Sequence, residues 1–116
     1  MMNTAIHTAI EPLIRRNIFT TEEEAVRKIV RAYVLQQIAA IQKEISQFEK
    51  KYGMQFEEFC GYLSQRSELL VSTDLSESQR QSLSRSVMQE EDDWLDWKAS
   101  QEMLDRWLGI SGEVDA

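Results

Sequence analysis

The sequence is poor in the residues that most often carry chemistry, with one cysteine, one histidine, one proline and four glycines among 116 residues. Cys60 stands alone, which excludes an internal disulfide and a metal site built on cysteines. His7 has neither a second nitrogen ligand for a transition metal nor the partners of a catalytic triad. An enzyme is therefore the class of protein that the sequence supports least.

Recognisable ligand-binding motifs are also missing. There is no glycine-rich phosphate loop, and the four acids at 90–93 lack the alternating spacing and the glycine of a calcium loop. The Glu-x-x-His repeats of two-metal helical bundles are absent too. Paired carboxylates leave Mg²⁺ as a remote alternative, and we expect no cofactor.

Long apolar runs are lacking as well. None approaches the roughly 18 residues that cross a bilayer, and the first residues lack the basic and apolar regions of a signal peptide. We therefore expect a soluble, cytoplasmic protein with no membrane partner. The length of 116 residues and the 42% hydrophobic content predict a single domain with a core of its own.

The net charge of −7 is unevenly distributed along the chain. Residues 1–31 carry +1, residues 32–67 are neutral, and residues 68–116 hold four basic side chains against twelve acids, a net −8. Such a C-terminal half repels nucleic acid and attracts basic surfaces. A small basic protein is the partner that this charge pattern favours.

Helix-forming residues dominate and no stretch alternates with the period of a strand, so we expect an all-α fold. The first helix is expected to end near Arg16, with Thr4 or Thr8 as its N-cap. Residues 2–8 are alternatively a short strand. The second helix is expected over about 22–52, begun by a capping box of Thr20 with Glu23 or of Thr21 with Glu24.

The second predicted helix carries an apolar seam with a 3.5-residue period. A helix of this length runs about 46 Å, whereas a compact globule of this size has a radius of gyration of only about 13 Å. The seam is therefore either a dimer contact or a surface covered by the fourth helix. Its residues are Val34, Ile38, Ile41, Ile45, Phe48 and Tyr52.

Together these patterns predict an elongated, dimeric helical bundle with two long helices, at about 22–52 and 77–108, and shorter first and third helices. The stretch 72–86 is rich in serine, so it is either a loop with a solvated N-terminal helical turn or a partly mobile hinge. Within one domain of 1–116, the predicted segments are the N-terminal helices and dimerisation segment at 1–53, a short helix at 54–71, a hinge at 72–86 and an acidic, tryptophan-rich helix at 87–109.

The acidic helix contains all three tryptophans of the chain. At 100° per residue its apolar side chains cover roughly 220°, more than the stripe of about 100° that a surface helix needs. It is either a core helix buried on a wide face or an exposed strip that a basic partner covers, because aromatic residues anchor many interfaces. The predicted partner-binding residues are Glu90, Glu91, Asp92, Asp93, Trp94, Asp96, Trp97 and Trp107.

A small basic cluster surrounds the turn between the first two helices. Positive charge at such a turn suits contact with DNA phosphates, but Arg15 and Arg16 also complement the C-terminal dipole of the first helix. DNA is therefore a possible second partner. The candidate contacts are Arg15, Arg16, Arg27, Lys28 and Arg31.

Residues 17–31 (NIFTTEEEAVRKIVR) resemble the turn and second helix of ribbon-helix-helix proteins. A longer pattern, running from IEPLIRRNIFTTEEEA through EKKYGMQFEEF to EEDDWLDWKASQEML, is similar to small prokaryotic antitoxins of toxin–antitoxin pairs. The resemblance implies a dimeric N-terminal region that touches operator DNA and a C-terminal part that neutralises a toxin.

Carried over by position, the resemblance implies that Trp94, Trp97 and the acids at 90–93 face the toxin. The turn and dimer core fall on Phe19, Thr20, Ala25 and Val26. One departure concerns DNA: the family reads bases from a basic strand, and residues 1–9 contain no Lys or Arg. We expect an antitoxin-like interaction module, with a DNA-binding regulator and a purely structural, self-associating module as the alternatives.

Overall fold

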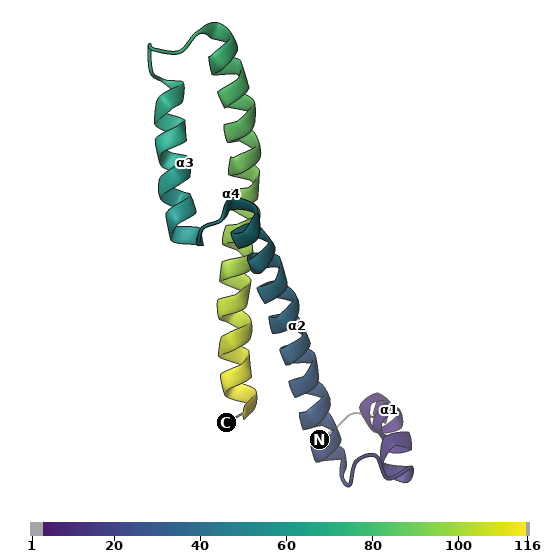
Figure 1. Cartoon of the computed structure of the whole chain (residues 1–116). Helices are drawn as coiled ribbons and strands as arrows, with labels where there is room; N and C mark the ends of the chain where they lie inside the picture. The colour runs from purple at the N-terminus through teal and green to yellow at the C-terminus, as the bar shows by residue number, and fades with distance from the viewer. Residues whose placement is uncertain (1–3, 116) are drawn as a thin grey trace. The chain divides into compact units, whose positions relative to one another are not determined.

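The computed structural model describes residues 4–115, and all the regular structure within them is helical (Figure 1). The predicted all-α class is confirmed. Thr4–Thr8 is helical, so the alternative of a strand is wrong there, and its first two residues lie outside the described part. The helices are α1 (Thr4–Arg15), α2 (Glu22–Tyr52), α3 (Phe56–Leu70) and α4 (Glu77–Asp115).

The turn between α1 and α2 is held by side chains that the sequence places at the start of α2. The backbone N–H of Glu24 donates to the Thr21 hydroxyl at 3.1 Å, and the Glu24 carboxylate accepts from the Thr20 backbone N–H at 3.0 Å. Hydrogen bonds from Lys28 and Thr20 lower the pKa of Glu24 to about 2. These bonds satisfy donors that a helix start leaves unpaired.

A capping box at the start of α4 decides between the two predictions for the serine-rich stretch. The backbone N–H of Gln79 donates to the Ser76 hydroxyl at 3.2 Å, and the Ser76 N–H donates to the Gln79 amide oxygen at 2.9 Å. Arg80 donates to the carbonyls of Leu70 and Ser72, which fixes the preceding loop. The serine-rich stretch 72–86 is therefore a short loop followed by the first turns of α4, as one of the two predictions had it, because Ser76 caps the helix.

The helix α4 also continues beyond its predicted end at 108, passing through two glycines to Asp115. Contacts with α2 hold these last turns. The rings of Tyr33 and Trp107 meet edge to face with centroids 5.9 Å apart, and Arg31 pairs with Asp115 at 3.2 Å. Tertiary packing thus overrides the low helix propensity of glycine.

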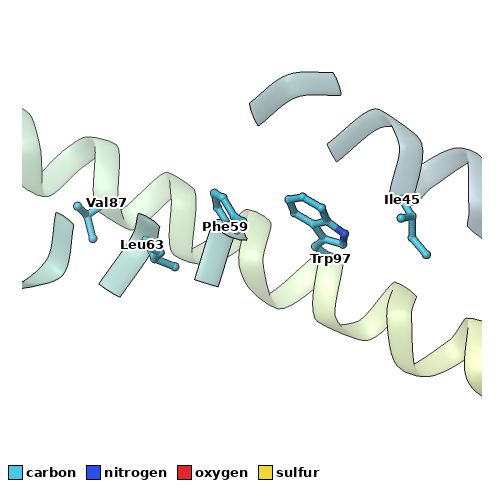
Figure 2. Close-up of a cluster of buried hydrophobic side chains, with 5 residues drawn as sticks. All are labelled: Ile45, Phe59, Leu63, Val87 and Trp97. Carbon is cyan, nitrogen blue, oxygen red and sulfur yellow. The ribbon is translucent and has the colours of Figure 1, made fainter. Parts of the chain in front are cut away.

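The chain forms two compact units where one domain was predicted. The first unit comprises the residues up to Ala39 together with those from Arg106 onward, and the second comprises Ala40–Asp105. In the first unit, Ile10 of α1 and Ala25 of α2 are buried. The core of the second unit consists of Ile45, Phe59, Leu63, Val87 and Trp97 (Figure 2).

The apolar seam of α2 is covered by the chain's own helices. Val34, Ile38 and Ile45 are buried, and the other seam residues pack against the core of the second unit. The prediction that the seam holds a dimer is therefore corrected, because three of these side chains are buried in one chain and the other three are partly covered. The corrected positions are Val34, Ile38, Ile41, Ile45, Phe48 and Tyr52.

Within residues 4–115, none of the helices combines the length and the apolar character that crossing a membrane requires.

Candidate functional site

Trp97 lies at the centre of the second unit, where α4 meets both α2 and α3. Its side chain is 0% exposed. It stacks on Phe48 with centroids 5.4 Å apart and contacts Phe59 at 5.2 Å. The wide apolar arc of α4 is explained by these two neighbours, so Trp97 belongs to the core and its predicted role as a surface contact is corrected.

Two of the predicted partner-binding acids are held inside the same unit. The buried Glu90 carboxylate accepts from Arg66 Nε at 2.6 Å. Asp93 accepts from Lys51 Nζ at 2.6 Å and from the Tyr52 hydroxyl. Both carboxylates stabilise the packing of α4 in this conformation, so neither belongs to the open acidic surface that was predicted.

The environment of Asp93 changes the proton affinity of two groups. Burial alone raises the pKa of its carboxyl, but the hydrogen bonds from Lys51 and Tyr52 and the positive charge of Lys51 outweigh burial, and the pKa is lowered. Burial raises the pKa of Tyr52, and the hydrogen bond that it donates to Asp93 raises it further. Asp93 is thus ionised and Tyr52 protonated at neutral pH.

Trp94 is half-buried and held in one orientation by three contacts. Its ring stacks on Phe56 with centroids 6.5 Å apart, and its Nε1 donates to Cys60 Sγ at 3.3 Å. The Lys98 ammonium lies 5.2 Å from the ring centroid. A fixed aromatic surface of this kind loses little conformational freedom when it is covered.

Beside Trp94, a groove of about 420 Å³ opens between α3 and α4. Its walls are mostly apolar, and Leu95, 57% exposed, stands on its α4 side. Among the lining residues, Glu91 contributes a carboxylate. We call this the α3–α4 groove; its residues are Cys60, Leu63, Ser64, Ser67, Glu91, Trp94 and Leu95.

Of the predicted partner-binding residues, only Glu91 and Trp94 line the α3–α4 groove. Asp92 and Asp96 are exposed outside its walls, and Trp107 belongs to the other unit. The sequence interpretation missed Leu95 and the whole α3 wall. Small side chains at helical spacing on α3 were the available signal, but small residues alone do not reveal a groove.

A second hollow, of about 520 Å³, lies between α2 and α4 in the same unit. Its walls are more polar, and they carry Lys51 as well as the carboxylates of Glu44 and Asp96. Ser100 donates to Glu44 at 3.2 Å across it. Mixed charges and internal bonds make it a less selective binding surface than the α3–α4 groove.

The second unit carries the entire net charge of the protein. Ala40–Asp105 contains seven Lys or Arg and fourteen Asp or Glu, which gives −7, while the first unit holds six of each sign and is neutral. The α3–α4 groove is therefore part of a strongly acidic body.

The predicted DNA contacts lie in the neutral unit. Arg15 pairs with Glu11 at 3.3 Å, Lys28 with Glu24 at 2.8 Å, and Arg31 with Asp115. Arg16 and Arg27 are exposed. Neighbouring carboxylates thus offset much of the positive charge that phosphate contact requires.

Across residues 4–115, no three side chains of His, Cys, Asp or Glu come close enough together to hold a metal ion. Neither a protein-family profile, nor a curated protein, nor a solved structure shows a significant match to the chain. The geometry and charge of the two units are therefore the basis for a functional argument.

Proposed function

We propose that the chain is a protein-interaction module that binds and neutralises a small basic protein, as antitoxins do, through the α3–α4 groove. One observation carries the proposal. An apolar groove walled by Trp94 and Leu95, with Glu91 at its side, lies in the unit that holds the whole net charge of −7.

The two properties of the groove act at different stages of binding. The acidic unit attracts a basic partner over several ångströms and raises its rate of encounter. An apolar side chain of the partner then enters between α3 and α4, while a Lys or Arg pairs with Glu91. Fixed aromatic walls and a central apolar anchor are the features that dominate binding energy at interfaces.

Direct action on operator DNA is the less favoured function. The unit that contains the basic cluster is neutral, and three of the five candidate cations are paired with carboxylates. Retention of the chain on duplex DNA at low salt, lost on Arg27→Glu, would restore DNA as a partner.

The test of the groove is a matched pair of substitutions on exposed leucines. Leu95→Glu places a charge at the groove, whereas Leu69→Glu makes the same change on the far side of α3; the two leucines are 57% and 50% exposed. We expect a small basic protein to co-purify stoichiometrically with the wild type and with Leu69→Glu, and to be lost with Leu95→Glu. Losing such an anchor costs about 2 kcal/mol or more.

Neutralisation is tested separately from binding. We expect the captured protein, expressed alone, to arrest growth, and co-expression of the wild type to restore it. Undiminished capture by Leu95→Glu would contradict the groove as the binding surface. A captured protein that is harmless when expressed alone would contradict the antitoxin role while leaving the interaction in place.

A further inference from the structure

The first unit has an apolar face that does not participate in the proposed binding of a basic protein. In this unit, α2 and the end of α4 lie side by side, and the Tyr33–Trp107 contact shows which flanks meet. At 100° per residue, one flank of α2 over residues 26–33 and one flank of α4 over residues 107–114 are apolar. Glu22 and Glu23 precede the first flank, and Arg106 and Glu113 lie at the edge of the second. We call this the neutral face; it comprises Val26, Val30 and Tyr33 of α2 and Trp107, Ile110 and Val114 of α4.

Half of the neutral face is open to solvent in the single chain, while Val26, Trp107 and Val114 are partly buried. Tyr33 is 55% exposed and Val30 is 42% exposed, and Ile110 on α4 is exposed as well. Contiguous apolar side chains on two adjacent helices are expensive to leave in water.

The opposite face of the same two helices has a different composition. It carries the Arg31–Asp115 pair across the helices and the Lys28–Glu24 pair along α2, beside the exposed Leu35 and Leu108. The two faces of this helix pair therefore differ as the inner and outer faces of a bundle layer do. The charged face is suited to solvent and the neutral face to burial.

We propose that a second copy of this chain covers the neutral face, so that α2 and α4 of the two copies form a four-helix bundle. The six side chains of the neutral face include no carboxylate, and the unit as a whole is neutral. Two such layers cover each other without removing charge from water, which is the usual construction of a helical bundle. The partner-binding groove lies in the other unit, so the two interactions use separate surfaces.

Charges at the border of the neutral face support a symmetric pairing. Arg106 and Glu113 are seven residues apart on the same side of α4, and they bracket Ile110. A two-fold axis close to Ile110 brings Arg106 of each copy toward Glu113 of the other, and this complementarity favours an antiparallel arrangement.

Sedimentation velocity across a range of concentrations tests the pairing. We expect the wild type to sediment as a dimer with twice the 13.6 kDa mass of one chain. Val30→Glu is expected to raise the dissociation constant at least about tenfold, because it places a charge in the neutral face. Leu35→Glu, on the charged side of α2 and 48% exposed, is the matched control and is expected to remain dimeric.

A covalent test examines the symmetry. In a Cys60→Ser background, Ile110→Cys is expected to form an intermolecular disulfide on mild oxidation, because the axis brings the two positions within reach. Leu108→Cys, on the opposite side of α4, is expected to remain uncrosslinked. Circular dichroism checks that each variant keeps its helical content.

A wild type that stays monomeric at all concentrations would overturn the proposal, whatever the variants do. Equal dissociation by Val30→Glu and Leu35→Glu, or equal crosslinking from positions 110 and 108, would overturn the assignment to the neutral face. Because Leu95→Glu lies in the other unit, its effect on partner capture is independent of these results.

Discussion

At the scale of single residues, neighbours in the sequence have separate roles because each step along a helix turns the side chain by 100°. Glu90 and Trp97 point into the core of the second unit, whereas Glu91 and Leu95 reach the α3–α4 groove. A run of acids and tryptophans that reads as one binding motif is therefore divided between packing and recognition. The period of the helix could be predicted from sequence, but which side met α3 could not.

The lowered pKa of Asp93 predicts how the stability of the protein changes with pH. Since the folded state lowers its pKa, its contribution to stability is fully present above the ordinary value of about 3.9 and is lost as pH falls through the lower folded value. We expect Asp93→Asn to cost about 1–2 kcal/mol at neutral pH, since it removes a charge-assisted hydrogen bond.

Urea denaturation from neutral pH down to strongly acidic conditions measures this cost. The difference between the wild type and Asp93→Asn should stay constant down to about pH 4 and shrink below it. Asp92→Asn, a change at the exposed neighbour, is the control and should leave stability nearly unchanged. A difference that persists or grows in acid would show that the Lys51–Asp93 pair is not its source.

At the scale of elements, the ends of helices could be predicted where capping chemistry is local. The bounds of α2 follow from the capping side chains before Glu22 and from Gly53, whose φ of 65° ends the helix in the left-handed region. The end of α4 was predicted too early, because glycine at position 109 is typical of the residue that follows a helix C-terminus. Contacts with α2 hold that stretch helical, and these tertiary contacts leave no local signal.

Two glycines of the second unit should respond in opposite ways to alanine. Gly53→Ala forces a side chain into a positive φ and should cost about 1 kcal/mol. Gly61 lies within α3 with open space where a Cβ would stand, so Gly61→Ala should stabilise by about 0.5–1 kcal/mol. Chemical denaturation of both variants is the measurement, and shifts of the same sign would contradict the assigned backbone conformations.

At the scale of the whole molecule, the net charge resides in the second unit, whereas exposed apolar side chains occur in both units. The all-α class could be predicted because helix formers and periodicity extend along the chain. The coverage of the α2 seam could not, since a 3.5-residue period suits a second copy and a helix of the same chain equally. The neutral face went unnoticed because it combines residues some eighty positions apart in the sequence.

This division predicts two different responses to salt. At about 0.1 M ionic strength, charges are screened beyond roughly 10 Å, so added salt should slow the association of a basic protein with the acidic unit. Self-association through the neutral face should weaken much less, because salt screens only the Arg106–Glu113 pairs at its border. Over one salt series, surface plasmon resonance measures the association with the basic protein and sedimentation velocity measures the self-association. An equal loss of affinity in both would show that charge pairing dominates both interactions.

The placement of the three indoles gives the protein built-in optical reporters. Trp94 lines the α3–α4 groove, Trp107 is part of the neutral face, and Trp97 is buried in the core of the second unit. Indole emission shifts with the polarity around the ring, so filling the groove should alter the light from Trp94 and pairing of two copies the light from Trp107. Trp97 supplies a constant background, and both events can be followed without any attached dye.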